Sequence, residues 1–379
     1  MEDIEIISLS QKILQIDTTN PPGDQIEAVN LLTEQMEKIG GKTKIHYVKD
    51  APSLIAEFQA HKSGNKLCWI GHWDTVPTGP INAWTKSTPW EGKISEGVLY
   101  GRGACDMKTA LIAAWGAASE WVKNPTRCGT LVLAFFADEE NGGQRGASQL
   151  MKQLNAKYRF DYGLVGEPTN FNITIARRGV CWGYIHFFGK QAHAARPDEG
   201  DNPIYKMARA VRLLENLSMT YNEDIFLGKP TLSVTTARSG NASNVIPHNA
   251  KIGVDIRTVP GQTHEKVVGD IQNLLLKNGF KNDDFKIDLG WLANPYKTDN
   301  EEYIRACTEI VEDVMDRSPE ISGRGGTSDG RFLSNLGVPV VEIGLENTSL
   351  HQVNEFCRVD SIITLKKIYT RIFEHFLTA

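Results

Sequence analysis

The chain of 379 residues lacks any pair of cysteines at the C-x-x-C spacing of zinc fingers and redox motifs. Cysteines scattered singly fit reduced, packed thiols better than a disulfide framework or a zinc finger. The sequence therefore argues against a small disulfide-stabilised fold and against a cysteine-based metal site. The six cysteines are Cys68, Cys105, Cys128, Cys181, Cys307 and Cys357.

Long runs of positive charge or of apolar residues are lacking too. The 41 Lys and Arg stand against 46 Asp and Glu, a net charge of −5, and without a basic tract we expect no nucleic-acid partner. No apolar run approaches the roughly 18 residues that a membrane span needs. The N-terminal stretch MEDIEIISLSQKILQ carries acids where a targeting peptide would carry Lys or Arg. We expect a cytoplasmic protein that does not contact a membrane.

The length and the 41% hydrophobic content allow two cores. In the first part of the chain, helical periodicity alternates with apolar runs typical of strands. This alternation predicts an α/β fold, with three layers built on a sheet of parallel character. The expected helices are 27–40, 107–122 and 147–154, and the expected strands are 53–59, 66–71, 130–137 and 161–166.

The pattern changes between residues 178 and 293 and then returns to α/β alternation. The middle segment is typical of a small α+β sandwich inserted into the larger domain. We expect a larger domain of residues 1–177 and 294–379 and an inserted domain of residues 178–293. The inserted segment has β-runs at 180–189, 231–238, 251–258 and 285–290 and helical patterns at 202–217 and 264–279, and it is followed by a helix at 301–315, a strand at 338–344 and an amphipathic C-terminal helix.

Acids and histidines follow several of the predicted strands. In open α/β sheets, binding residues gather in the loops beyond the carboxyl ends of the strands. Each residue alone has a simpler interpretation, such as a loop cap, a helix N-terminus or a solvated acid. Together, several acids at one sheet edge would repel one another unless a cation neutralised them. The residues are His72, Asp74, Asp106, Glu139, Glu140, Glu167 and His351.

Two imidazoles with three or four carboxylates suit Zn²⁺, with Mn²⁺ or Co²⁺ as substitutes. These are too many ligands for one tetrahedral ion, but two ions that share a bridging carboxylate and a water would use them all. Such a pair would acidify the water and polarise a carbonyl, as amide hydrolysis requires. A carboxylate that binds no metal must still move the proton, and adjacent Glu139 and Glu140 can divide the roles of base and ligand.

These residues resemble the dinuclear zinc aminoacylase and carboxypeptidase family. The matching strings GHWDTVP, YGRGACDMK, ADEEN, VGEPT, RRG, GKQAHAARP, NVIP, GGTSDGRF and HQVNE fall in order from Gly71 to Glu355. The resemblance implies two zinc ions per subunit. It implies that His72 and Glu167 bind one zinc, that Glu140 and His351 bind the other, that Asp106 bridges them, that Glu139 is the general base and acid, and that Asp74 fixes the tautomer of His72.

In this family the small domain mediates dimerisation. Its histidine in the GKxAH string, here His193, reaches into the partner's active site and stabilises the tetrahedral oxyanion. The resemblance therefore implies a homodimer. Without it, His193 would be read as a histidine of a surface loop.

The C-terminal stretch GGTSDGRFLSNLGVPVVEIGLENTSLHQVNE resembles the desuccinylase branch of the family. This implies hydrolysis of N-succinyl-LL-2,6-diaminopimelate, an N-acyl amino acid whose free succinyl carboxylate an arginine fork can bind. Each matching residue could instead be structural, for example Arg257 paired with a neighbouring acid or Asn244 capping a turn. The matching substrate-binding positions are Arg178, Asn244, Arg257, Gly326, Thr327 and Asn347.

Two departures leave the substrate open. Val180 and Cys181 follow RRG where desuccinylases tend to have a small polar residue, and GACDMKTA and EPTN are shared with a broader deacylase branch. An N-acetylornithine deacetylase, or a peptidase that requires a free C-terminal carboxylate, is the alternative within the family. Outside catalysis, the chain could be an inactive dimeric binding protein that keeps the fold.

Overall fold

The apolar run Leu67–Ile70 lies at the centre of a mixed sheet. In this computed structural model, which describes residues 3–21 and 25–378, β3 (Lys62–His72) is buried along its second half. It pairs in parallel with β6 (Cys128–Phe136) and β7 (Tyr162–Val165), and β7 pairs in parallel with β17 (Val340–Glu342). The flanking pairs β1–β2, β2–β6 and β17–β8 are antiparallel. The expected parallel character therefore holds for the centre of the sheet.

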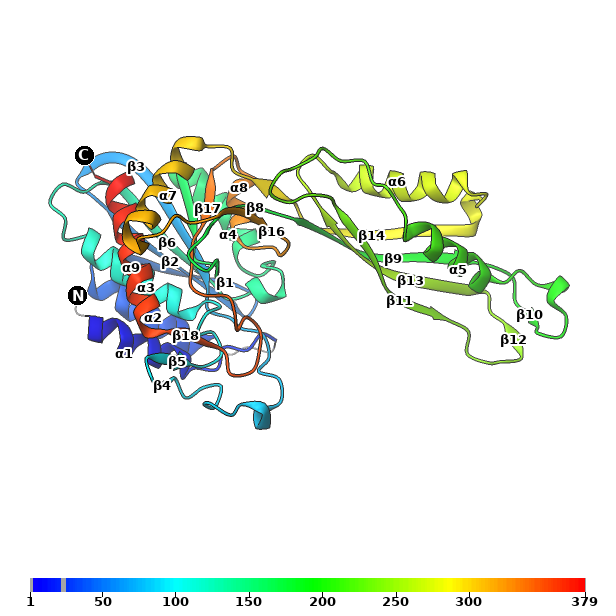
Figure 1. Cartoon of the computed structure of the whole chain (residues 1–379), viewed down its shortest axis with the longest axis horizontal. Helices are drawn as coiled ribbons and strands as arrows, with labels where there is room; N and C mark the ends of the chain where they lie inside the picture. The colour runs from blue at the N-terminus through cyan, green and yellow to red at the C-terminus, as the bar shows by residue number, and fades with distance from the viewer. Residues whose placement is uncertain (1–2, 22–24, 379) are drawn as a thin grey trace. The chain divides into compact units, whose positions relative to one another are not determined.

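Helices cover both faces of this sheet. The Trp69 ring packs on Tyr369 of α9 with ring centroids 5.7 Å apart. Leu333 of α8 lies over Gly163, whose partner in β3 is Cys68. Because Cys68 and Trp69 are consecutive in a strand, they point to opposite faces, so α8 and α9 lie on opposite sides. The three-layer α/β architecture expected from the sequence is confirmed (Figure 1).

The predicted elements occur within a few residues of their expected bounds. The helices α1 and α8 and the strands β1, β4, β5, β8, β10, β12, β15, β16 and β18 were not predicted. The order in the large sheet is β1-β2-β6-β3-β7-β17-β8-β15, with β16 on β8, and a small sheet has the order β18-β5-β4. The remaining elements here are α1 (Asp3–Leu14), α2 (Ile26–Lys38), β1 (Lys42–Val48), β2 (Ala51–Gln59), η1 (Ile81–Ala83), β4 (Lys93–Ser95), β5 (Val98–Tyr100), α3 (Lys108–Trp121), η2 (Glu139–Asn141), α4 (Ala147–Tyr158), β8 (Ile173–Arg177), β15 (Tyr296–Lys297), α7 (Glu301–Met315), β16 (Ile321–Arg324), α8 (Gly330–Ser334), β18 (Phe356–Arg358) and α9 (Val359–Phe376).

The middle segment forms an antiparallel sheet of order β11-β13-β9-β14. One face carries buried apolar residues, among them Ile185, Phe187 and Ile252, which pack with Ile271 and Leu275 of α6. Two helices therefore cover one face of the sheet, as expected for the inserted α+β sandwich. The elements are β9 (Gly179–Phe188), β10 (Ala192–His193), η3 (Pro197–Glu199), α5 (Pro203–Leu214), β11 (Thr231–Ser239), β12 (Val245–Ile246), β13 (Asn249–Thr258), α6 (His264–Lys277), η4 (Asn282–Asp284) and β14 (Phe285–Ala293).

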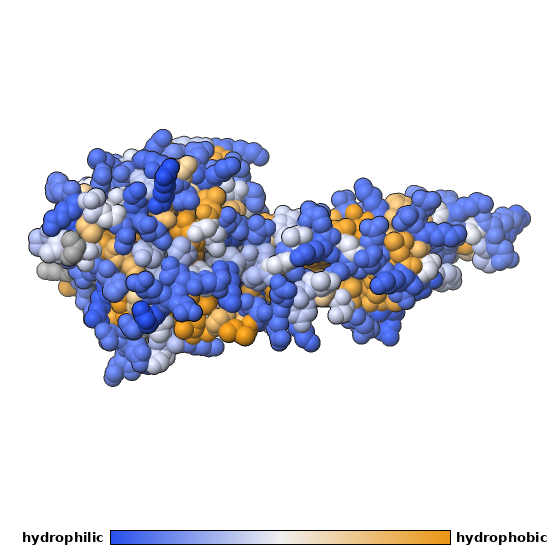
Figure 2. All heavy atoms as spheres, turned by 90° about the horizontal axis from the view of Figure 1, so that it is seen from above, coloured by the Kyte–Doolittle hydropathy of each residue, from blue (hydrophilic) through white to orange (hydrophobic). Residues whose placement is uncertain are grey.

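The chain divides into two compact units. Unit 1 comprises Met1–Ile175, Lys297–Ser322 and Ser328–Ala379, and unit 2 comprises Ala176–Tyr296 with Gly323–Thr327. Part of the glycine-rich loop that the sequence assigned to the larger domain thus groups with unit 2. Figure 2 shows hydrophilic residues over most of the visible surface of each unit, with smaller hydrophobic groups between them. Within the described residues, every helix is too short or too polar to cross a membrane.

Candidate metal centre

The predicted acids and histidines of unit 1 converge at the carboxyl edge of the sheet. Because β6, β3 and β7 are parallel neighbours, their last residues and following loops meet at the same edge. His72 is the last residue of β3, and the turn η2 after β6 begins with Glu139 and Glu140. Glu167 follows β7, Asp106 precedes α3, and His351 lies in the loop after β17.

Asp106 lies between the two histidines. The Nε2 atom of His72 is 3.3 Å from Asp106 Oδ1 and 3.7 Å from Glu167 Oε1. On the other side, His351 Nε2 is 3.1 Å from Asp106 Oδ2 and 3.2 Å from Glu140 Oε1. The five residues thus form two groups of potential ligands, and Asp106 belongs to both.

These separations fit metal ligands better than ion pairs. Charge-assisted hydrogen bonds between nitrogen and a carboxylate are about 2.7–2.9 Å long. Two ligand atoms bound at about 2.0–2.1 Å to one tetrahedral zinc ion lie about 3.3 Å apart. The buried atoms Asp106 Oδ1 and Glu140 Oε1 also find no hydrogen-bond partner among the described residues. Buried carboxylate oxygens without partners are costly, so the residues present fit two cations bridged by Asp106.

Burial and the neighbouring charged groups shift the pKa values of the residues in the cluster. Burial opposes a charged His72, but the nearby carboxylates of Asp106 and Asp74 raise the pKa of its imidazole well above the usual value. The Asp106 carboxylate, which is hydrogen-bonded to the ring, and the nearby Glu140 carboxylate raise the pKa of His351 to about 10. Burial, assisted by the charge of Asp106, raises the pKa of Glu140 to about 7. In the protein alone, the cluster therefore balances its charge with protons, which a divalent cation would displace on binding.

Asp74 holds the turn that carries the two adjacent glutamates. Its Oδ1 and Oδ2 atoms accept the backbone N–H groups of Glu139 and Glu140, each at 3.1 Å, and Oδ2 also accepts Asn20 Nδ2 at 2.9 Å. His72 Nδ1 lies 3.0 Å from the Asp74 backbone carbonyl and 3.5 Å from its carboxylate. The closest contact to the His72 ring is thus the Asp74 main chain, whereas the sequence predicted its side chain. Either contact places the ring proton on Nδ1 and leaves Nε2 free for a metal.

Glu355 holds the bridging residue Asp106. Its Oε1 accepts the backbone N–H groups of Cys105 at 3.0 Å and Asp106 at 3.2 Å. Its Oε2 pairs with Arg102 at 2.5 Å, and both side chains are buried. Arg102 also donates to the carbonyl groups of Gln352 and Pro77. One buried ion pair therefore connects the Asp106 backbone to the loop that carries His351.

Another buried acid, Asp329, lies close enough to Glu139 for the charge of Glu139 to act on it. Asp329 is 2% exposed, and within the described part of the chain neither of its carboxylate oxygens has a hydrogen-bond partner. Burial, assisted by the charge of Glu139, raises its pKa to about 8. Arg331 Nη1 approaches to 3.8 Å, but this guanidinium donates its hydrogen bonds to the carbonyls of Ser328 and Gly142.

The expected substrate-binding residues are spread over both units. In unit 1, the half-buried Asn347 accepts a backbone hydrogen bond from Leu350. In unit 2, the Arg178 guanidinium donates to the Leu227 carbonyl at 2.5 Å.

The other positions in unit 2 are paired or exposed. The Arg257 guanidinium pairs in two places with Asp255, at 2.8 and 3.1 Å, which is the structural interpretation that the sequence left open. Asn244 and Gly326 are exposed, and Thr327 is half-buried.

The exposed His193 lies in β10, and its Nδ1 accepts the Ala195 N–H at 3.1 Å.

Sequence reasoning missed the residues that hold the ligands in place. Asn20 was read only as part of a turn, 20–24, of which residues 22–24 lie outside the described residues. Glu355 and Arg102 stand in the strings HQVNE and YGRGACDMK without an assigned role. Their partners, both main-chain groups and side chains, are distant in sequence, so the spacing of residues could not indicate these contacts.

Comparison with known proteins shows the family of the chain. The model of peptidase family M20/M25/M40 matches residues 68–375. A succinyl-diaminopimelate desuccinylase of Azoarcus sp. is 35% identical, over 83% of this chain and 83% of the relative. One from Psychrobacter sp. is 30% identical, over 98% of this chain and 96% of the relative.

Solved structures share the fold along nearly the whole chain. The metallo-carboxypeptidase Sso-CP2 of Sulfolobus solfataricus has a TM-score of 0.79 at 20% identity and covers 99% of both chains. The aminopeptidase PepT of Bacillus cereus has a TM-score of 0.82 at 18% identity, over 99% of this chain and 98% of that one. The YXEP protein of Bacillus subtilis, a dinuclear metal binding peptidase, has a TM-score of 0.75 at 15% identity, over 99% of this chain and 98% of that one. The chain belongs to peptidase family M20/M25/M40 and is a metal-dependent hydrolase.

Proposed function

We propose that the protein hydrolyses N-succinyl-LL-2,6-diaminopimelate to succinate and LL-2,6-diaminopimelate with two zinc ions per subunit. The observation that carries the proposal is the position of Asp106, with one carboxylate oxygen facing His72 and the other facing His351. The names of the relatives support the substrate, because both are desuccinylases that match over most of their length. Co²⁺ or Mn²⁺ would substitute for zinc at a mixed imidazole and carboxylate site.

The proposed ligands are the residues that the geometry groups together. His72 and Glu167 would hold one ion, Glu140 and His351 the other, and Asp106 both. Two divalent cations held there supply an acidified water and a polarised amide carbonyl. Glu139 stands outside both ligand groups, and we assign it the proton transfer from the attacking water to the leaving nitrogen. The Asp74 carboxylate accepts the backbone N–H groups of both Glu139 and Glu140, so it fixes the position of the proposed base relative to the proposed ligand.

His193 is proposed to stabilise the oxyanion from the partner subunit of a homodimer. Its Nδ1 accepts the Ala195 N–H, so the neutral ring carries its proton on Nε2. A ring N–H is the donor that a developing oxyanion requires. The exposure of His193 in the single chain is consistent with a residue that acts on another subunit.

Deacetylation of an N-acetyl amino acid such as N-acetylornithine is the second candidate. This candidate is favoured by the partners that the two arginines already have within the chain. The Arg257 guanidinium pairs with Asp255, and the Arg178 guanidinium donates to the Leu227 carbonyl. An acetyl group has no distal carboxylate and would need neither guanidinium.

A turnover assay with both substrates separates these candidates. The purified protein, loaded with Zn²⁺ or Co²⁺, is given succinyl-diaminopimelate and acetylornithine side by side, and amine release is measured. We expect a kcat/KM for the succinyl substrate that is higher by at least 100-fold, because desolvated carboxylate recognition discriminates strongly. A preference for acetylornithine would transfer the assignment to the deacetylase, and inactivity with both by metal-loaded protein would refute amide hydrolysis of these substrates.

A further inference from the structure

The sheet of unit 2 has one face covered by helices and one face open. Along β9, Ile185 and Phe187 are buried beneath the helices, whereas Trp182 is 49% exposed and Tyr184 is 43% exposed. Alternate residues of a strand point to opposite faces. His186 therefore shares the open face with Tyr184.

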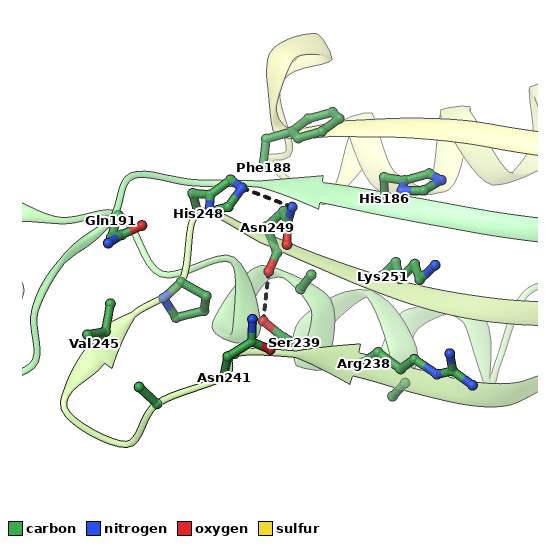
Figure 3. A pocket seen from close by; sticks show the side chains of 15 residues that line it. His186, Phe188, Gln191, Arg238, Ser239, Asn241, Val245, His248, Asn249 and Lys251 are labelled. Carbon is green, nitrogen blue, oxygen red and sulfur yellow. Dashed lines mark hydrogen bonds between the residues drawn. The ribbon is translucent and has the colours of Figure 1, made fainter.

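Four basic side chains form a row across this open face. Arg238 on β11 lies opposite Lys251 on β13, Lys251 lies opposite His186 on β9, and His186 lies opposite Lys286 on β14. Directly opposite residues of antiparallel strands point to the same face, about one strand spacing of 4.8 Å apart. Figure 3 shows His186, Lys251 and Arg238 on three neighbouring strands. We call Arg238, Lys251, His186 and Lys286 the basic row.

Acids do not neutralise the basic row within the described chain. Asp255 on the same face is held by Arg257, and Asp288 lies opposite Tyr184 without an ion pair among the described residues. Lys251 Nζ lies 4.5 Å from the centre of the Tyr184 ring. Like charges placed directly opposite each other destabilise a sheet, so an anion bound between Arg238 and Lys251 would relieve their repulsion.

A hollow of about 900 Å³ lies over one end of the basic row. Arg238, Lys251 and His186 line it, and the residues that line it in the described chain include neither Asp nor Glu. Gln191 and Asn241 contribute amide groups, and Asn249 is held by hydrogen bonds to His248 and Ser239 (Figure 3). The hollow therefore combines fixed positive charge with neutral donors.

We propose that the basic row binds a small anion that carries two carboxylate or phosphate groups about one strand spacing apart. Two anionic groups at this separation pair with Arg238 and Lys251, while the His186 ring and the amides donate neutral hydrogen bonds. Nucleic acids are a poorer match, because backbone binding uses six to ten phosphate contacts in typical cases and the row offers three fixed cations. The site lies wholly within unit 2 and does not depend on the proposed reaction.

Calorimetric titration of the full-length, metal-loaded protein tests the site. The probes are succinate, pyrophosphate and, as the single-charge control, acetate, all at matched ionic strength. The row variant is Arg238→Gln/Lys251→Gln. The matched control is Lys229→Gln/Lys277→Gln, which removes two exposed cations of unit 2 and keeps the basic row and the metal centre. Binding of a probe to the metal is therefore common to all three proteins.

We expect the control to bind succinate or pyrophosphate within twofold of the wild type and the row variant at least tenfold more weakly. Acetate should bind the wild type at least tenfold more weakly than whichever of succinate and pyrophosphate binds more tightly. Tighter binding of succinate would identify carboxylate as the preferred anionic group, and tighter binding of pyrophosphate would identify phosphate. Equal binding by the row variant and the control, or binding no tighter than acetate, would overturn the proposal. Thermal melting gives a second measurement, because whichever of succinate and pyrophosphate binds more tightly should raise the Tm of wild type and control more than that of the row variant.

Discussion

The two units carry charge in opposite ways. In unit 1, acids are buried together at the carboxyl edge of the sheet, and two of their oxygens lack hydrogen-bond partners among the described residues. In unit 2, basic side chains stand half-buried or exposed in a row, and the candidate residues His193 and Asn244 are exposed. Burial makes the acids of unit 1 depend on a cation, whereas exposure leaves the residues of unit 2 available to a ligand or a second subunit.

Because of this contrast, a single chain is enough to propose roles for the residues of unit 1. It is not enough for every residue of unit 2. The unit 1 site is complete in itself, since each potential metal ligand contacts another within one compact unit. The proposed role of His193 requires the active site of another subunit. The variants with the largest expected effects therefore lie in unit 1.

The largest expected effect follows from Glu139→Gln. Because Glu139 stands outside both ligand groups, the variant should bind metal with wild-type stoichiometry but lose about 10²- to 10⁴-fold in kcat, as for the removal of a general base. Metal content and turnover are measured on the same preparation. The matched variant Glu140→Gln should lower metal content, since Glu140 contacts His351. Full activity in metal-loaded Glu139→Gln would end its assignment as the base.

Arg102→Ala should produce the next largest effect, on stability. It leaves Glu355 buried without its ionic partner, and breaking a buried ion pair typically costs about 3–5 kcal/mol. Urea denaturation measures the loss. Arg212→Ala, which breaks the exposed pair with Glu215, is the control and should leave the midpoint nearly unchanged. Equal effects of the two variants would show that burial in unit 1 has no special energetic weight.

A smaller effect is expected on substrate binding from the arginines of unit 2. Arg178→Ala should raise KM for the succinyl substrate about 10- to 100-fold, since a hydrogen bond to a charged group contributes about 1.5–3 kcal/mol. Arg257→Ala should change KM by less than about threefold, because Asp255 occupies its guanidinium. Steady-state kinetics of both variants test the pair. A larger increase in KM for Arg257→Ala would show that the Arg257 guanidinium leaves Asp255 and binds the substrate instead.

Much of the fold and of the ligand set could be predicted from the sequence. The alternation of helical and strand patterns gave the three-layer sheet, and the acids after β3, β6 and β7 meet because those strands are parallel neighbours. Several strands were missed because β1 has three of its seven residues exposed and β4 and β5 are three residues long. Such strands have too little apolar periodicity to be recognised.

The supporting contacts could not be predicted, because they join groups that are distant in sequence. Glu355 accepts the amide of Asp106, 249 residues away, and Asn20 reaches Asp74 across 54 residues. A carboxylate or an amide in a loop has many partners available, and the fold selects one of them. The basic row could not be predicted either, because its members come from four strands and the register between those strands cannot be derived from the sequence.

The smallest effect concerns Asp329 and the pH dependence of stability. Its folded-state pKa is about 8, above the value of about 3.9 for an unfolded chain. Between these values the folded state binds more protons than the unfolded state, so stability falls as pH rises. In metal-free protein this proton should contribute a loss of up to about 1.4 kcal/mol per pH unit. Glu140, with its pKa raised to about 7, acts in the same direction.

Urea denaturation of chelator-treated protein at pH 5.5, 6.5 and 7.5 measures this slope. Asp329→Asn removes the titrating group at nearly constant volume, so its slope should be shallower than that of the wild type and its stability relatively greater at pH 7.5. Asp283→Asn, on the exposed turn η4 of unit 2, should keep the wild-type slope. If Asp329→Asn also keeps it, Asp329 is already ionised in the folded protein and must be neutralised by Arg331, which would make this buried acid a structural ion pair.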